Sequence, residues 1–319
     1  MGEKAQELLR IADQLAGKGH AYPTRAVAAM LVLRSVLEQK DLSRSPWTSS
    51  GRTRLDLALE DPRTAAAALQ VQWQNWRGIG DRASLFPEEE PFRDFPSRRL
   101  VVAAEEVRDL LEDLSAQEEY SVGGLFDLFL SKLGEHRSMK EGESTTPRPV
   151  NDLLVRLADL RRGMVVGDFY AGVGGTLVSA LAHVGVPDRG EAPISGAEIN
   201  EETVFLARVN LLLHGADPAL VRWENTISSW RPTDGQGQNF DRVLSNPPFG
   251  LYYDRAEYRA PQDLLGLTSR SKSELMMLQQ MRASLRPGGR AIMAMAHGPL
   301  FRGGPEENIR RALLELSLI

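Results

Sequence analysis

The sequence predicts an α/β domain built on a parallel sheet, preceded by an all-α domain. From about residue 150 onward, apolar runs of strand length alternate with segments of helical periodicity, which is typical of a parallel sheet. Before about residue 135 the periodicity is helical throughout. The polar stretch between them, residues 135–149, contains Gly142, Pro147 and Pro149 and predicts a boundary between domains.

The first half carries apolar residues at helical spacing in several segments. They lie at residues 8–15, 26–37, 63–76, 100–114 and 122–133. The stretch 78–96 is rich in Gly, Pro and Glu and predicts a loop. We therefore predict a helical domain over residues 1–137, followed by a linker at residues 138–149.

The second half predicts strands at residues 164–169, 193–199, 220–225, 241–246 and 290–296. The helices expected before and between them cover residues 150–160, 176–184, 201–214 and 273–285. Gly288 and Gly289 are predicted to turn the chain into the last of these strands. The α/β domain is expected to span residues 150–319.

Composition excludes several classes of protein. The chain has 319 residues, no cysteine, five histidines without metal-ligand spacing and a net charge of −5. No apolar run approaches the roughly 18–20 residues of a membrane-spanning helix, and the N-terminus lacks a signal-peptide pattern, so a cytoplasmic protein is expected. Because phosphate neutralisation supplies most non-specific affinity for nucleic acid, the acidic charge argues against a chain that grips DNA or RNA alone. The acidic charge is compatible with a catalytic subunit whose partner makes most of the contacts to the nucleic acid.

The segment Asn246-Pro247-Pro248-Phe249 follows the fourth predicted strand. Its prolines fix φ and lack N–H donors, so nearby acceptors are not paired by the local backbone. The side-chain oxygen of Asn246 and the carbonyl of Pro247 can then accept hydrogen bonds from one planar NH2 group, while Phe249 stacks on the ring that carries it. This pocket suits the exocyclic amine of adenine. The alternative for the segment alone is an ordinary turn, and Tyr252 and Tyr253 either line the pocket or are structural.

Other strand ends carry residues suited to a nucleoside. A glycine-rich turn, with Gly172, Gly174 and Gly175, follows Asp168, although it lacks the last glycine of a dinucleotide motif. Glu198 ends the second strand and can accept hydrogen bonds from ribose hydroxyls; Asn225 ends the third and can reach an adenine edge. The alternatives are a packing turn, a solvated carboxylate and a residue without a role. Since ligands bind at the carboxyl ends of parallel strands, we expect one cofactor site.

Residues 142–319 resemble the amino-type S-adenosylmethionine-dependent DNA methyltransferases, and among them the methylation subunit of type I restriction–modification systems. The motifs that carry this resemblance are Thr145-Thr146-Pro147-Arg148, Asp168 to Gly175, Glu198-Ile199-Asn200, Asn210 to Gly215, Asn246 to Phe249, Leu285 to Arg290, and Leu300 to Gly304 with the helix after it. The helical half resembles the family's helical domain more loosely.

The resemblance implies a Rossmann-like methyltransferase sheet and methylation of adenine N6 in DNA, with S-adenosylmethionine as cofactor, in a restriction–modification or related defence system. It implies DNA as a partner, with a separate specificity subunit and a restriction subunit, and no metal. The catalytic residues it implies are Asn246, Pro247, Pro248 and Phe249. The cofactor-binding residues it implies are Thr146, Pro147, Asp168, Ala171, Gly172, Gly174, Gly175, Glu198, Ile199, Asn225, Thr226 and Asn246.

The chain departs from the family pattern in its glycine-rich turn. Phe169, Ala171 and Val173 stand where the family has Pro, Cys and a hydroxyl residue, and Asn225 stands where it has Asp. The resemblance also predicts two more strands and a helical part after residue 316, so the sheet is expected to be incomplete at its C-terminal side. Two alternatives stay open: a methyltransferase acting on RNA adenine or protein glutamine, and a non-catalytic subunit that binds S-adenosylmethionine or serves assembly.

Overall fold

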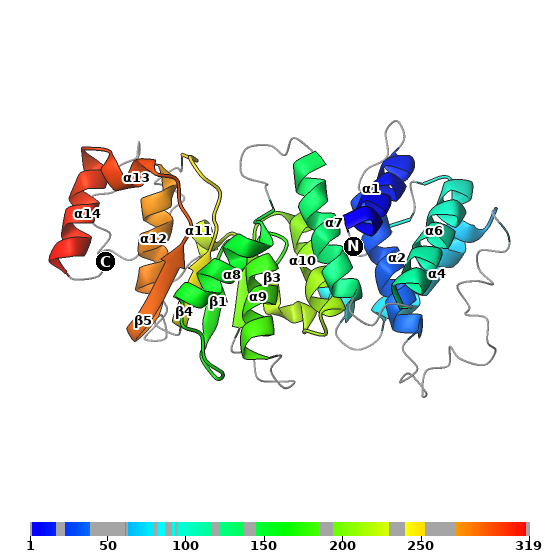
Figure 1. Cartoon of the computed structure of the whole chain (residues 1–319), viewed down its shortest axis with the longest axis horizontal. Helices are drawn as coiled ribbons and strands as arrows, with labels where there is room; N and C mark the ends of the chain where they lie inside the picture. The colour runs from blue at the N-terminus through cyan, green and yellow to red at the C-terminus, as the bar shows by residue number, and fades with distance from the viewer. Residues whose placement is uncertain are drawn as a thin grey trace. The chain divides into compact units, whose positions relative to one another are not determined.

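A computed structural model shows the chain as two compact units (Figure 1). The first contains residues 1–136 and 208–218, and the second contains residues 137–207 and 219–319. The structure describes residues 2–16, 23–38, 61, 63–78, 82–86, 91–92, 95–115, 121–136, 145–185, 194–229, 240–252 and 272–316. Most of the predicted linker, residues 138–144, lies outside this range, as does Tyr253.

The first unit is helical in its described part. Its helices are α1 (Gly2–Ala16), α2 (Pro23–Glu38), α4 (Ala65–Arg77), α5 (Arg82–Leu85), α6 (Ser97–Ser115) and α7 (Val122–His136). Helix α1 packs on α2, α6 and α7 through an apolar face that includes Leu8, Ile11 and Leu15. The prediction of a continuous loop over residues 78–96 was wrong at α5, where Phe86 follows the helix and packs against Trp73 and Trp76 with ring centroids 5.8 and 5.1 Å away.

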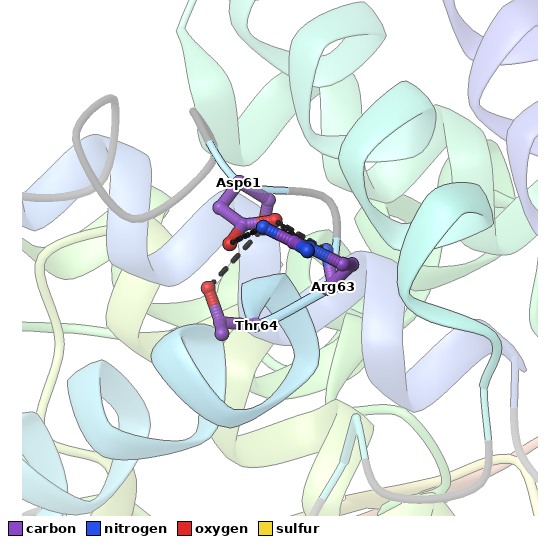
Figure 2. A network of polar contacts seen from close by, with 3 residues as sticks. All are labelled: Asp61, Arg63 and Thr64. Carbon is purple, nitrogen blue, oxygen red and sulfur yellow. Dashed lines mark hydrogen bonds and ion pairs between the residues drawn. The ribbon is translucent and has the colours of Figure 1, made fainter.

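A local network precedes α4 (Figure 2). The carboxylate of Asp61 accepts hydrogen bonds from the backbone N–H of Arg63 at 3.0 Å and from its guanidinium at 3.1 Å. The hydroxyl of Thr64 donates to the Asp61 carbonyl at 3.2 Å, and the Thr64 carbonyl then accepts the helical bond from Ala68. The bonds from Arg63 hold the pKa of Asp61 below its usual value. The network is exposed and lies directly before the first residue of α4.

Residues 208–218 complete the first unit around α7. His214 Nε2 lies 3.3 Å from the Asp127 carboxylate, and its Nδ1 lies 2.9 Å from the carbonyl of Asn210. A Cβ on Gly123 would lie 2.8 Å from the His214 ring, so α7 needs glycine at that point. The segment Asn210 to Gly215, which resembles a family motif, therefore packs within the helical unit.

The second unit is built on a parallel sheet with the strand order β3-β2-β1-β4-β5. Its strands are β1 (Val166–Asp168), β2 (Ile194–Glu198), β3 (Val221–Trp223), β4 (Phe240–Ser245) and β5 (Leu285–Met293). The helices are α8 (Arg148–Leu157), α9 (Gly175–Val184), α10 (Glu201–Leu213, shared with the first unit), α11 (Thr226–Ser229), α12 (Ser273–Ala283), α13 (Gly298–Phe301) and α14 (Pro305–Glu315), with a short 3-10 helix at Pro218–Leu220. A parallel sheet preceded by a helical region confirms the predicted fold class.

Gly288 and Gly289 lie inside β5, in an irregular stretch that precedes the regular pairing with β4, and this pairing begins at Arg290, the predicted start of the strand. The strand begins at Leu285, and its pairing with β4 shifts register between Phe240 and Arg242. Gly288 has φ +79°, a conformation that favours glycine, which fits this irregularity. Pro287 lies in the same strand, where its missing N–H is tolerated at the edge of the described sheet.

Packing fixes the middle of the sheet and the helices beside it. A Cβ on Gly167 of β1 would lie 2.7 Å from the ring of Phe240 on β4, so glycine makes room for that ring. Helices α8 and α9 pack on each other, and α12 packs on β5 (Figure 1). The buried residues of α12 and α14 share a core with Tyr170, Ile227 and Met293. In the part of the chain that the structure describes, no helix has the length and apolar character needed to span a membrane.

Candidate functional site

The carboxyl ends of the strands meet at one edge of the second unit, at the point where the strand order reverses. The chain moves outward from β1 to β2 and β3, then crosses back to β4 on the other side of β1. Asp168 ends β1, and Ser245 ends β4. Open α/β sheets bind ligands in the crevice at such a switch point. The predicted site residues of β1, β2 and β4 are therefore neighbours.

Asp168 lies at the centre of this edge with 1 % of its surface exposed. Its Oδ1 accepts hydrogen bonds from the Ser245 hydroxyl and from the backbone N–H of Tyr170 at 3.1 Å. Its Oδ2 is buried and forms no hydrogen bond of normal geometry, although the nearby Thr176 side chain acts to lower the pKa of the carboxyl. Burial raises the pKa of Asp168 from 3.8 to about 6. The carboxyl thus has a free acceptor and gains from a cationic partner.

The glycine-rich turn leads from β1 into α9. Gly172 and Gly174 have φ values of +53° and +82°, which L side chains rarely adopt. The backbone N–H of Gly172 donates to Glu198 Oε2 at 3.0 Å, and that of Ala171 donates to the carbonyl of Ala197 at 2.9 Å. A Cβ on Gly175 would lie 2.6 Å from the side-chain nitrogen of Asn151, so α8 closes over the start of α9. Backbone hydrogen bonds therefore attach the turn to β2, and its glycines leave the backbone uncovered by side chains of their own.

Glu198 holds two loops at the end of β2. Besides Gly172, it accepts from the backbone N–H of Asn200 at 2.8 Å. Each carboxylate oxygen therefore has one described donor, and a carboxylate can accept about four hydrogen bonds. Next to it, Ile199 is 60 % exposed and Trp223, at the end of β3, is 62 % exposed. The Trp223 indole donates to the backbone carbonyl of Ile199 at 2.9 Å, which holds the Trp223 side chain beside the end of β2.

Asn225 and Thr226 make internal contacts. Asn225 Oδ1 accepts from the backbone N–H of Ile227 at 3.0 Å, which caps α11. The Thr226 hydroxyl donates to the carbonyl of Phe169 at 3.2 Å. Neither makes a described hydrogen bond to Asp168, Glu198 or Asn246. Thr226 thus attaches the segment after β3 to the end of β1, whereas Asn225 caps α11.

Asn246 follows β4 and contacts the segment before α8. Its side-chain nitrogen donates to the Thr146 hydroxyl at 2.9 Å. Its Oδ1 is buried and has no described hydrogen-bond partner. Pro247 is buried, Pro248 is half-buried and the Phe249 side chain is 45 % exposed. Pro147, beside Thr146, precedes the first residue of α8. The Asn-Pro-Pro-Phe segment thus combines a spare acceptor with an exposed aromatic ring.

Several residues at this edge were missed from the sequence. Ser245, Tyr170, Trp223, Glu274 and Gln280 all contact or adjoin the strand ends. The hydroxyl of Tyr170 donates to Gln280 Oε1 at 2.7 Å, and Gln280 Nε2 donates to the Thr226 carbonyl at 2.6 Å. No signal in the sequence marks Glu274 or Gln280, because α12 is buried nearly all round and holds further buried polar residues such as Gln279. Among the residues that the structure describes, no cluster of three His, Cys, Asp or Glu could hold a metal ion.

The strand order and the glycine-rich turn after β1 define a class of fold found in S-adenosylmethionine-dependent methyltransferases. A putative class I S-adenosylmethionine-dependent methyltransferase from Listeria monocytogenes shares it with a TM-score of 0.53 at 14 % identity, covering 99 % of this chain and 80 % of that one. More specifically, the chain belongs to the N-6 DNA methylase family, whose sequence model matches residues 117–319. This confirms the resemblance found in the sequence.

Individual relatives agree with the family. The chain is 29 % identical to the type I restriction enzyme EcoEI methylase subunit of Escherichia coli, over 63 % of this chain and 41 % of that protein. It is 26 % identical to the MpnII methylase subunit of Mycoplasma pneumoniae, over 69 % of this chain and 45 % of that protein. A type I restriction–modification methyltransferase subunit from Streptococcus thermophilus shares the fold with a TM-score of 0.71 at 23 % identity, covering 98 % of this chain and 78 % of that one. The chain spans less than half the length of these two curated relatives.

Proposed function

We propose that the chain methylates adenine N6 in DNA, with S-adenosylmethionine as the methyl donor, as the modification subunit of a restriction–modification or related defence system. The observation that carries the proposal is Asn246, whose Oδ1 is buried without a donor beside the exposed Phe249. Membership of the N-6 DNA methylase family supports the choice of adenine. The proposed partners are DNA, a specificity subunit and a restriction subunit.

The residues at the neighbouring strand ends fit the cofactor. S-adenosylmethionine carries two cationic groups. The two carboxylates at this edge, Asp168 and Glu198, make it a favourable place for a ligand of positive charge. Asp168 Oδ2 is buried and forms no hydrogen bond of normal geometry, which suits a cationic N–H group. Gly172 and Gly174 leave backbone open to close approach, and Glu198 retains lone pairs for ribose hydroxyls.

The rest of the proposed cofactor site follows from the same geometry. Ile199, joined by the Trp223 side chain, would cover the adenine face of the cofactor. Thr146 and Pro147 would border it from the α8 side, where Asn246 donates to Thr146, and Asn225 with Thr226 would support it from β3. When bound, the cofactor supplies a methyl group that is already activated on a sulfonium.

The Asn-Pro-Pro-Phe segment then has the task of binding and orienting the target amine. Adenine N6 is a poor nucleophile because its lone pair is delocalised into the ring. Acceptance of its two N–H groups by Asn246 Oδ1 and the Pro247 carbonyl favours a tetrahedral nitrogen, which stabilises the transition state more than the ground state. Pro248 keeps the backbone rigid, and Phe249 would stack on a base flipped out of the duplex.

A pair of substitutions tests the proposal by separating the two halves of the site. Asn246→Ala is expected to lower the rate of methyl transfer by about 100- to 1000-fold, since a preorganised polar contact is lost. Its dissociation constant for S-adenosylmethionine should stay within about twofold of the wild type. Glu198→Ala is expected to raise that dissociation constant by about tenfold or more, through loss of a charged acceptor that also holds the glycine-rich turn.

The measurements are calorimetric titration of S-adenosylmethionine and transfer of a radiolabelled methyl group to unmethylated DNA in the presence of the specificity subunit. Wild-type activity in the Asn246→Ala variant would remove Asn246 from the reaction. An unchanged cofactor dissociation constant in Glu198→Ala would remove Glu198 from the cofactor site.

A second candidate function is that of a non-catalytic subunit that binds the cofactor or serves assembly. Phe169, Ala171 and Val173, where the family pattern has other residues, favour it. Binding of S-adenosylmethionine by the wild type without methyl transfer to any DNA would support this candidate. Methyl transfer to RNA or to protein glutamine, assayed in parallel, would instead support a methyltransferase with another acceptor.

A further inference from the structure

The loop after Phe249 is attached to the start of α12 by backbone and side-chain contacts. The backbone N–H of Gly250 donates to Glu274 Oε1 at 2.9 Å. The backbone N–H of Ser273 donates to the Leu251 carbonyl at 2.9 Å. Tyr252 forms an antiparallel bridge with Lys272, whose ammonium lies 5.6 Å from the centre of the Tyr252 ring. Residues 250–252 thus run along the first residues of α12.

We propose that Glu274 is a positioning residue that fixes the Phe249–Gly250 peptide, and with it the aromatic platform for the methyl-accepting base. The assignment rests on the proposed function. It names a residue outside the Asn-Pro-Pro-Phe segment that controls the acceptor side of the site without touching the cofactor side.

The geometry of Gly250 explains why its hydrogen bond bears on the position of Phe249. The N–H of Gly250 belongs to the same peptide plane as the Phe249 carbonyl, so its direction helps to set the backbone that carries the ring. Gly250 has φ +72°, a conformation that only glycine adopts without strain, and glycine loses much freedom when it is ordered. A charged acceptor holds such an N–H more strongly than a neutral one.

The burial of Glu274 argues against a merely structural role. Its side chain is fully buried, in a helix whose residues 273–277 and 279–281 are all buried. Its Oε2 is buried without a described hydrogen-bond partner. A buried carboxylate with a spare oxygen costs stability, and an apolar side chain of similar size would pack there more favourably. An apolar side chain, however, would supply no acceptor for the backbone N–H of Gly250.

Helix α12 also offers a matched comparison, because Gln280 serves the other half of the site. Gln280 is fully buried, accepts from the Tyr170 hydroxyl and donates to the Thr226 carbonyl. These contacts reach the ends of β1 and β3, which form the proposed cofactor side. Substitutions at Glu274 and Gln280 therefore remove buried polar groups from one helix but should loosen different loops.

The test compares Glu274→Met, Glu274→Gln and Gln280→Met by residue-resolved hydrogen–deuterium exchange. Glu274→Met should raise amide exchange at Gly250 by about tenfold to hundredfold, the loss expected for a hydrogen bond to a charged group. Its melting temperature should equal or exceed that of the wild type. Glu274→Gln retains an oxygen acceptor and should restore protection. Gln280→Met should leave Gly250 protected and raise exchange near Tyr170 and Thr226.

A kinetic measurement then links the loop to the reaction. In the complex with its specificity subunit, Glu274→Met should lower kcat/KM for DNA by at least about tenfold. Its calorimetric dissociation constant for S-adenosylmethionine should stay within about twofold, and Glu274→Gln should recover most of the DNA activity. Unchanged exchange at Gly250 would overturn the positioning role. So would a matching loss of stability and activity, or cofactor binding weakened as much as DNA methylation.

The two proposals fail in distinguishable ways. If the wild type transfers no methyl group to DNA, the proposed function fails, while the exchange data still decide whether Glu274 holds the loop. If the wild type is active and Glu274→Met has wild-type kinetics, the positioning role fails alone.

Discussion

At the residue scale, the Asp168 carboxyl combines near-complete burial with an oxygen that forms no hydrogen bond of normal geometry. Burial, with a smaller contribution from the nearby Glu198 carboxylate, raises its pKa to about 6 and outweighs the Ser245 hydroxyl, the Tyr170 N–H and the Thr176 side chain, which favour the charged form. A cation bound at this edge would favour the charged carboxylate and oppose the effect of burial. The residue is therefore better suited to a bound ligand than to the stability of the free protein.

The raised pKa of Asp168 predicts a specific pH dependence of stability. Between 3.8 and about 6, the folded protein binds more protons at this carboxyl than the unfolded chain does. The stability that this carboxyl contributes is thus fully present below about pH 4 and is lost as the pH rises to about 6. Above pH 6 the free energy of unfolding no longer changes through this group. The difference between the two pKa values corresponds to a change of about 3 kcal/mol in the free energy of unfolding.

Denaturant unfolding of the wild type and of the Asp168→Asn variant at several pH values measures the pH dependence that Asp168 is expected to cause. The difference in free energy of unfolding between the two proteins should shift against the wild type by up to about 3 kcal/mol from pH 4 to pH 7. A difference that does not vary with pH would contradict the assignment of the raised pKa to Asp168.

At the element scale, the irregularity in β5 depends on two adjacent glycines with different constraints. Gly288 adopts a positive φ, whereas Gly289 is limited by space. A Cβ on Gly289 would lie 2.9 Å from the Arg286 carbonyl oxygen and 3.1 Å from that of Phe240. Both are backbone atoms, so neither can rotate away. The register shift between β4 and β5 is therefore tied to glycine at residue 289.

Gly289→Ala is accordingly expected to lower the free energy of unfolding by about 1–3 kcal/mol, in the range of overpacked sites. Gly303→Ala is the matched control, because its Cβ would meet only Glu307 at 3.8 Å and its φ is not in the positive region. The control should stay within about 0.5 kcal/mol of the wild type. Equal losses in the two variants, measured by thermal and denaturant unfolding, would refute the steric explanation.

At the scale of the whole molecule, the net charge of −5 bears on how the chain would bind the DNA that we propose as its substrate. Most non-specific affinity for DNA comes from neutralising phosphates with lysine and arginine, and an acidic chain gains little of it overall. The site on the second unit is expected to act on DNA that a partner holds.

We expect the chain alone to bind duplex DNA no more tightly than about 1 μM at 0.15 M salt, and to bind more tightly once the specificity subunit is added. Fluorescence anisotropy with a labelled duplex, repeated at several salt concentrations, measures this. Binding well below micromolar by the isolated chain would show that it carries a DNA-binding surface of its own.

Periodicity and turn residues were enough to predict the helical region, the parallel sheet and the glycine-rich turn, because these depend on local pattern. The same reasoning found the irregular stretch at Gly288 and Gly289 and the regular pairing from Arg290, but not that β5 already begins at Leu285. It also missed Ser245 and Gln280, whose partners, Asp168 and Tyr170, are far away in the sequence. The residue types proposed for the site were readable, whereas their hydrogen-bond partners were not.

The amino-acid order alone specified the kinds of groups at the strand ends: a carboxylate after β1, another after β2, and an amide with two prolines and an aromatic ring after β4. Hydrophobic period and turn chemistry act over a few residues, so the chain displays them directly. Tertiary structure alone decided which oxygens form no hydrogen bond of normal geometry, Asp168 Oδ2 and Asn246 Oδ1 among them. It also decided that Glu274 holds the residue after Phe249. Burial and hydrogen-bond partners arise from contacts between distant segments, and these exist only in the folded chain.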